Sequence, residues 1–241
     1  MRYFGGKARI GKTLAGIINR LDGTYWEPFC GMFSVGKYVT LPRSASDTQA
    51  DLILLLTAVR DGWVPPGTVT EEEYNRLKTA APSPLRAFAG FGCSNSGKFF
   101  GGYAREKGNR NFAKNAANSL VALRPMIQGV SFALHPYYEG DADVVYCDPP
   151  YDGTTGFTVG KFDSADFWEW ARAKSQQSVV LVSEYTAPDG FVTLWQKEVK
   201  TDMNGTKGKL ARVEKLFVHK SHEMRIPCTP RIGDHDEYTH R

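Results

Sequence analysis

The sequence predicts an α/β protein whose open sheet has helices on both faces and an inserted region in the middle of the chain. Short runs of β-branched and aromatic residues alternate with longer amphipathic segments at both ends of the 241-residue chain, a pattern typical of strands followed by helices. The stretch between the two ends is less regular. The 41% hydrophobic content is that of an ordinary globular protein.

The N-terminal part is predicted to hold two helices and two strands. We expect a helix over 12–21, a strand over 24–29, a short strand over 43–46 that leads to Asp47, and a helix over 49–59. The periodicity of the apolar residues supports each of these segments. Together they are expected to form the first half of a domain that comprises 1–61 and 136–226.

The middle of the chain, 62–135, is predicted to be an insertion. Thr70 followed by Glu73 is the signature of a capping box, and Pro82 should end the helix that begins there. Glycines and aromatic residues gather over 88–102, which we take as the core of the insertion.

Regular structure is expected to resume with a strand over 143–147. A helix capped by Ser164 should run to Lys174, with acids early and bases late as the helix dipole prefers. A buried strand over 179–183 and a hairpin follow. The hairpin strands are expected over 191–199 and 213–218, joined by the basic loop 200–212, and 227–241 is expected to be a polar tail.

Several classes of protein are excluded by composition. The apolar runs are too short to span a bilayer, and the N-terminus has no signal peptide. We therefore expect a cytoplasmic protein with no membrane partner. The four cysteines are scattered with no CxxC pair, so neither a metal site nor a disulfide framework is expected: Cys30, Cys93, Cys147 and Cys228.

The tetrapeptide Asp148-Pro149-Pro150-Tyr151 directly follows a predicted strand, at the sheet edge where α/β proteins bind ligands. A carboxylate and a proline carbonyl are both pure acceptors, so together they can take both protons of an exocyclic amine. Tyr151 offers a ring for stacking. For the tetrapeptide alone, a proline turn with a capping aspartate explains the residues equally well.

Two glycine motifs lie near the N-terminus. Residues 6–13 fit the P-loop pattern GxxxxGK[ST], but a P-loop must follow a buried strand and none is predicted there, so we reject that function. Residues 27–36 follow a strand and predict the first turn of a nucleotide-binding domain. Gly31 would admit a ligand close to the backbone, and Asp47 lies where such folds place an acid on ribose hydroxyls.

The segment 98–114 carries five cations and one acid, a net charge of +4 that equals the formal net charge of the whole chain. Phe99, Phe100, Tyr103 and Phe112 lie among these charges. Cations with stacking rings are typical of a nucleic-acid contact. A solvated basic loop is the alternative.

The succession of 3–7, 27–31, Asp47 and 148–151 resembles the DNA adenine methylase family, from Met1 to about His219. The resemblance implies a Rossmann-like methyltransferase sheet with an inserted target-recognition region, S-adenosylmethionine as cofactor with S-adenosylhomocysteine as product, and no metal. It also implies methyl transfer to N6 of an adenine flipped out of double-stranded DNA. A monomer on DNA is compatible with the sequence, which does not determine the oligomeric state.

Site residues follow from the resemblance position by position. The tetrapeptide Asp148, Pro149, Pro150 and Tyr151 would hold the target adenine. The cofactor residues would be Tyr3, Lys7, Glu27, Phe29, Gly31, Asp47 and Asp148. Candidates for DNA contact are the polar and basic residues of the insertion, namely Lys98, Arg105, Lys107, Asn109, Arg110, Asn111 and Lys114.

One position departs from the family, since Phe33 stands where a second glycine is usual. The close approach of the backbone to the cofactor is in question there. Two alternatives stay open on the sequence: an amino methyltransferase acting on cytosine N4 or RNA, and a catalytically impaired homologue that binds DNA.

Overall fold

The computed structural model describes residues 1, 3, 5–105, 111–151, 162–201 and 210–226. These residues form a seven-stranded sheet in the order β3-β2-β1-β4-β5-β7-β6. The strands are β1 Tyr25–Glu27, β2 Arg43–Asp47, β3 Ser131–Leu134, β4 Val144–Cys147, β5 Val179–Glu184, β6 Phe191–Thr201 and β7 Leu210–His219. The predicted α/β class with a Rossmann-like sheet is confirmed.

The order of the strands reverses direction between β1 and β4. The chain winds from β1 to β2 and β3 on one side, and from β4 to β5 on the other, and all of these neighbouring pairs are parallel. Strand β7 runs antiparallel to β5, and β7 and β6 form a long antiparallel hairpin. In open α/β sheets such a switch point opens a crevice at the carboxyl ends of the strands, where ligands bind.

The two faces of the sheet are covered by different helices. Side chains alternate along each strand, so Tyr146 packs with helices α1, Gly11–Ile18, and α2, Ala50–Arg60. Its neighbours Val145 and Cys147 pack instead with helix α6, Ser164–Lys174. Both faces of β4 and β5 are therefore buried, which explains why their sequences are continuous apolar runs.

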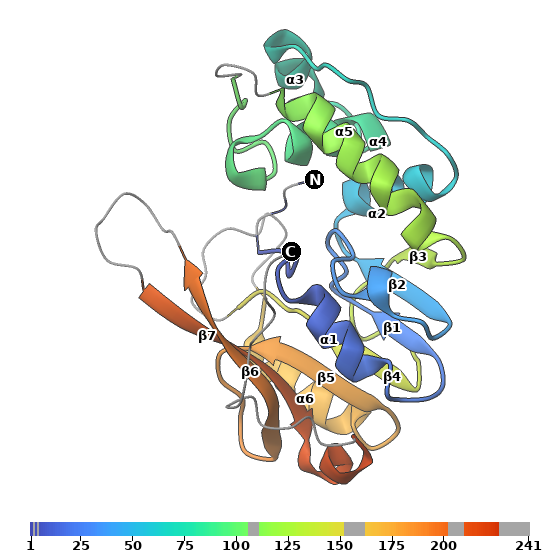
Figure 1. The fold of residues 1–241 in the computed structure, drawn as a ribbon, viewed down its shortest axis with the longest axis vertical. Helices are drawn as coiled ribbons and strands as arrows, with labels where there is room; N and C mark the ends of the chain where they lie inside the picture. The colour runs from blue at the N-terminus through green and yellow to red at the C-terminus, as the bar shows by residue number, and fades with distance from the viewer. Residues whose placement is uncertain (2, 4, 106–110, 152–161, 202–209, 227–241) are drawn as a thin grey trace, which may run out of the picture.

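The central part of the chain forms a helical lobe at the β3 end of the sheet, whereas the β6–β7 hairpin extends from the other end (Figure 1). The regular elements of the helical lobe are helices α3 Glu71–Lys78, α4 Pro84–Ala87 and α5 Phe112–Leu123, a π-helix η2 Phe88–Gly92, and 3₁₀-helices η3 Asn95–Gly97 and η4 Arg124–Ile127. The last residues of the predicted insertion, 62–135, include β3, which pairs with β2 as the edge strand of the sheet.

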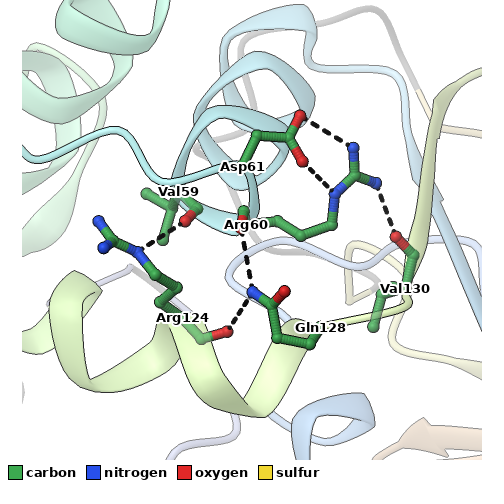
Figure 2. Close-up of polar contacts among 6 residues, drawn as sticks. All are labelled: Val59, Arg60, Asp61, Arg124, Gln128 and Val130. Carbon is green, nitrogen blue, oxygen red and sulfur yellow. Dashed lines mark hydrogen bonds and ion pairs between the residues drawn. The ribbon is translucent and has the colours of Figure 1, made fainter.

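The side chains of Arg60, Arg124 and Gln128 link the end of α2 to the segment that leads from α5 to β3 (Figure 2). Arg124 donates to the carbonyl of Val59 at 3.1 Å, and Gln128 donates to the carbonyl of Arg60 at 3.0 Å. Arg60 in turn donates to the carbonyl of Val130 at 2.8 Å, just before β3. The last carbonyls of a helix lack partners within the helix, so these bonds satisfy them and hold the insertion against the sheet.

Local signals in the sequence explain several helix ends. The hydroxyl of Thr70 accepts from the N–H of Glu73 at 3.1 Å, as the capping-box pattern predicts. The cap of α6 is Asp163 rather than the predicted Ser164, because the Asp163 carboxylate accepts from the N–H groups of Ala165 and Asp166. A 3₁₀-helix η1, Gly36–Tyr38, follows the glycine turn, and another, η5 Lys220–Arg225, follows β7.

Within the described ranges, no helix is long and apolar enough to cross a membrane. No cluster of three or more His, Cys, Asp or Glu side chains that could hold a metal ion occurs in that same part of the chain. Cys30, Cys93 and Cys147 are free and buried, and Cys228 lies outside the described residues.

Candidate active site

The predicted site residues converge on the carboxyl edge of the sheet. The turn that contains Gly31 follows β1, Asp47 ends β2, and Asp148 follows β4. Because β1 and β4 are the neighbours at the switch point, the glycine turn and the tetrapeptide follow adjacent strands, on the two sides of the position where sheets of this kind open a ligand-binding crevice.

Lys7 and Asp148 form an ion pair at this edge. The Lys7 Nζ lies 2.7 Å from Oδ1 of Asp148, and the two side chains are only 8% and 18% exposed. Burial raises the pKa of Asp148, and the Lys7 ammonium opposes that rise. Burial lowers the pKa of Lys7, but the Asp148 and Glu214 carboxylates outweigh it, so the net shift is upward and Lys7 stays charged.

The ring of Tyr151 packs against the same lysine. Lys7 Nζ lies 4.5 Å from the centre of the Tyr151 ring, and the Tyr185 ring meets Tyr151 edge to face at 4.6 Å. The Tyr151 hydroxyl donates to Oε2 of Glu214 at 2.8 Å. Cation–π attraction and this hydrogen bond fix the orientation of the ring.

Gly31, Asp47 and Tyr3 form the other side of the crevice. The N–H of Gly31 donates to Oδ2 of Asp47 at 3.0 Å, and the N–H of Gln49 donates to Oδ1 at 2.9 Å. Gly31 has a φ of 46°, and a Cβ there would lie 2.8 Å from the Tyr3 ring. Only glycine meets both demands. Burial, then Asp47, Cys30 and Asp148, raise the pKa of Tyr3, which therefore lies near both carboxylates.

Phe33 has a backbone conformation that is usual for glycine, the residue that the resemblance leads us to expect here. Its φ is 53°, in the left-handed region that non-glycine residues rarely adopt. The side chain is fully buried and packs edge to face on Phe132 of β3, with ring centres 5.5 Å apart. The ring is thus part of the core beneath the turn, and the path of the backbone at the crevice is retained.

Glu27 lies beneath the turn rather than in the open crevice. It is 2% exposed, and its Oε2 accepts from the Tyr25 hydroxyl at 2.7 Å and from the N–H of Gly36 at 2.8 Å. Burial raises the pKa of Glu27 to about 8, against these hydrogen bonds. This geometry makes Glu27 a support of the glycine turn. Direct contact with a cofactor stays a prediction.

Phe29 packs on the α6 side of the sheet. Its ring stacks on Tyr137 at 5.3 Å and meets Phe162 and Phe167 at 5.8 and 5.7 Å. The structure therefore brings together Tyr3, Lys7, Gly31, Asp47, Asp148 and Tyr151, and it places Glu27 and Phe29 around them.

The P-loop lookalike has a packing function. No strand precedes it among the described N-terminal residues, and Lys7 pairs with Asp148. Gly11, the first residue of α1, is pressed against the glycine turn, where a Cβ would lie 2.2 Å from the carbonyl oxygen of Ser34. A glycine is required there for close packing of helix on turn.

The predicted DNA-contact residues fall into three groups. Lys98 and Lys114 are exposed. Arg105 forms a two-bond pair with Glu71, at 3.0 and 2.6 Å, and Asn111 caps α5 by accepting from the N–H of Lys114. Lys107, Asn109 and Arg110 lie outside the described residues, as does most of the loop 200–212.

The aromatic residues of the same segment are used inside the insertion. Phe99 and Phe100 pack on each other and under the guanidinium of Arg86, at 5.1 and 5.5 Å. The Tyr103 hydroxyl donates to the carbonyl of Val69 at 2.7 Å. Phe99, Phe100 and Tyr103 are partly buried and pack against the core of the helical lobe, so each ring already has neighbours inside the insertion, and a nucleic-acid contact stays a prediction.

Sequence reasoning missed Glu214 and Tyr185. Tyr185 directly follows β5, the strand next to β4, so its position at the carboxyl edge was a usable signal. Glu214 lies on β7, whose antiparallel direction brings its early residues to this edge. Nothing in the local sequence distinguishes Glu214 from a surface acid of a hairpin.

No family model and no curated protein matches the chain. Among solved structures, a protein of Escherichia coli provisionally named as the methyltransferase yhhF is 9% identical with a TM-score of 0.39, over 88% of this chain and 86% of its own. The Pyrococcus horikoshii protein PH1948, provisionally named as an RNA methyltransferase, is 8% identical with a TM-score of 0.40, over 87% and 81%.

The glycopeptide N-methyltransferase MtfA, solved with S-adenosylhomocysteine, is 8% identical with a TM-score of 0.34, over 93% of this chain and 78% of its own. All three scores lie below 0.5, so these likenesses carry no argument about activity. The case for a function depends on the residues at the carboxyl edge of the sheet.

Proposed function

We propose that this protein is an S-adenosylmethionine-dependent methyltransferase that modifies N6 of adenine in double-stranded DNA. One observation carries the proposal. The tetrapeptide at 148–151 and the turn with Gly31 and Asp47 face each other across the switch point of the sheet. The group proposed to hold an amine and the group proposed to hold a nucleoside therefore follow neighbouring strands, which supports direct transfer between two ligands.

The residues on the β1–β2 side fit the proposed cofactor. Asp47 uses its oxygens to accept the N–H groups of Gly31 and Gln49, and each carboxylate oxygen has a second lone pair for a ribose hydroxyl. Gly31 brings the backbone close with no side chain between. The positive φ of Phe33 preserves this path.

The residues on the β4 side fit an exocyclic amine. The Asp148 carboxylate and the Pro149 carbonyl can accept the two N6 protons, which favours a nitrogen lone pair directed across the crevice. The cofactor would supply an electrophilic methyl group on a sulfonium. As the N–C bond forms and the C–S bond breaks, one N6 proton must leave, and a carboxylate with a raised pKa is a suitable first acceptor.

DNA is proposed as the substrate because the exposed cations of the insertion lie on the same chain as this site. Lys98 and Lys114 are exposed in the structure, and phosphate contacts by lysines position a duplex without specifying its sequence. The target adenine must leave the stack, at a cost of a few kcal/mol. Stacking on Tyr151 would recover part of that cost.

The deciding experiment is to incubate the purified protein with S-adenosylmethionine and random-sequence duplex DNA, and to map methylated bases one by one. We expect N6-methyladenine within a defined sequence context. Methylation of cytosine N4, or of an RNA pool but not DNA, would replace the substrate while keeping the amine chemistry. Absence of cofactor binding by calorimetry would overturn the proposal as a whole.

A further inference from the structure

Glu214 lies at the candidate site although it belongs to none of the motifs. Strand β7 runs antiparallel to β5 and pairs Lys215 with Glu184, the last residue of β5. The residue before Lys215 therefore reaches the carboxyl edge, where Tyr185 and the tetrapeptide lie. Glu214 is 14% exposed, so it is more than a surface acid of the hairpin.

One ammonium group lies between two carboxylates at this edge. Lys7 Nζ is 2.7 Å from Asp148 and 3.8 Å from Glu214. The Glu214 oxygen that faces Lys7 also accepts the Tyr151 hydroxyl at 2.8 Å. Lys7 therefore has a nearer and a farther counter-ion, and the farther one orients the tyrosine.

This arrangement bears on how an amine could reach Asp148. In the structure Oδ1 of Asp148 is held by Lys7, whereas the proposed function requires Asp148 to accept an N6 proton. A lysine that gave up its only counter-ion while 8% exposed would leave a buried charge unpaired, which is strongly unfavourable. A second carboxylate within reach removes that obstacle.

We propose that Glu214 is the second counter-ion of Lys7, which takes over the ammonium when an amino substrate occupies Asp148, and which holds the Tyr151 hydroxyl throughout. The inference depends on the proposed function for the role of Asp148. Glu214 acts through Lys7 and Tyr151 and is a positioning residue.

The directions of the pKa shifts of Lys7 and Asp148 agree with this exchange of counter-ions. Burial lowers the pKa of Lys7, and Asp148 and Glu214 together overcome that effect. Burial raises the pKa of Asp148, Lys7 lowers it, and Glu214 raises it. The other titratable groups that face Lys7 or Asp148 are Tyr3, Glu27, Tyr146, Cys147, Tyr151 and Tyr185.

The first test needs no catalysis. The pKa of Lys7 is measured by NMR with ¹³C-labelled lysine in the wild type, in Asp148→Asn, in Glu214→Gln and in the double variant. We expect Asp148→Asn to retain most of the raised pKa, because Lys7 moves to Glu214, and the double variant to fall below the ordinary lysine value of about 10.4.

An equal fall in Asp148→Asn and in the double variant would overturn the proposal. Should the double variant not fold, the single variant Glu214→Gln remains decisive, since it should lower the pKa of Lys7 and an unchanged value would refute the exchange. This result is independent of whether the protein methylates DNA.

The second test uses methyl transfer. Glu214→Gln should lower kcat/KM for DNA by about tenfold or more, leave the affinity for S-adenosylmethionine unchanged, and move the acid limb of the pH profile to lower pH, because Asp148 loses a neighbouring negative charge. Glu214→Asp should restore part of the rate. The matched control is Glu198→Gln on the neighbouring strand β6, where the carboxylate is exposed.

An unshifted pH profile in Glu214→Gln would overturn the proposal. A wild type that binds the cofactor but methylates no nucleic acid would refute the proposed function, and the Lys7 titrations would then still decide whether Glu214 is its second counter-ion.

Discussion

An ion pair at the carboxyl edge of the sheet and one on the surface of the helical insertion use the same kinds of side chain in different ways. At the edge, Lys7 and Asp148 pair at 8% and 18% exposure, whereas in the insertion Arg105 and Glu71 pair at 73% and 42%. An exposed pair contributes about 0–1 kcal/mol. Breaking a buried pair is far more costly, because the remaining charge has no water around it.

Aromatic rings differ in the same way. At the edge, Tyr151 packs against Lys7 and Tyr3 packs against Gly31, while Phe99 and Phe100 are packed under Arg86 inside the insertion. A list of cations and rings therefore does not distinguish a binding surface from a small core. The distinction depends on which groups are buried against each other.

The buried pair at the edge should be the most sensitive point of the molecule. Asp148→Ala removes the acceptor for the amine and the nearer counter-ion of Lys7, so we expect methyl transfer to fall by about a thousandfold or more. Initial rates measure this effect, and circular dichroism checks the fold. Asp189→Ala, in an exposed loop, is the control. Activity within tenfold of wild type would remove Asp148 from the reaction.

The core beneath the glycine turn should show the next largest effect. Phe33→Ala removes a fully buried ring and should cost about 3–5 kcal/mol of unfolding free energy. Phe33→Gly deletes more atoms but relieves the left-handed strain, so it should be more stable than Phe33→Ala by about 1 kcal/mol. Urea unfolding of both variants measures the order, and the reverse order would show that Phe33 is unstrained.

Glu27 should make stability depend on pH. Its folded-state pKa of about 8 lies above the ordinary 4.5, so the folded protein binds the extra proton more tightly and loses stability as pH rises between these values. The loss should approach about 1.4 kcal/mol per pH unit. The urea midpoints of the wild type and of Glu27→Gln, compared at several pH values, give the part of this loss that is due to Glu27. Parallel curves for the two proteins would contradict the assignment.

The exposed charges of the insertion should give the smallest effects on stability. Arg105→Ala should change the unfolding free energy by less than about 1 kcal/mol. If Lys98 and Lys114 contact phosphates, replacing both by alanine should reduce the slope of log K against log salt for DNA binding by about two. Arg105→Ala should reduce it less, because Glu71 already neutralises that cation. Equal salt slopes in the wild type and all variants would show that these side chains are solvated and do not contact DNA phosphates.

Several elements could be predicted from the sequence because their signals are local. The strand over 143–147, the helix over 164–174 and the strand over 179–183 agree with the observed β4, α6 and β5 to within a residue at each end. Each is a run long enough for periodicity and caps to define it. By contrast β3 has four residues, two of them exposed, and only its pairing with β2 makes it a strand.

The sequence by itself placed Asp148, Asp47 and Gly31 at the carboxyl edge of the sheet, since each comes at the end of a recognisable strand or directly after one. Tertiary structure decided how they are used. It placed Glu214 beside Lys7 through an antiparallel strand, buried Glu27 beneath the turn, and directed the ring of Phe33 into the core. Contacts between residues far apart in the chain depend on packing and strand direction, which no local pattern encodes.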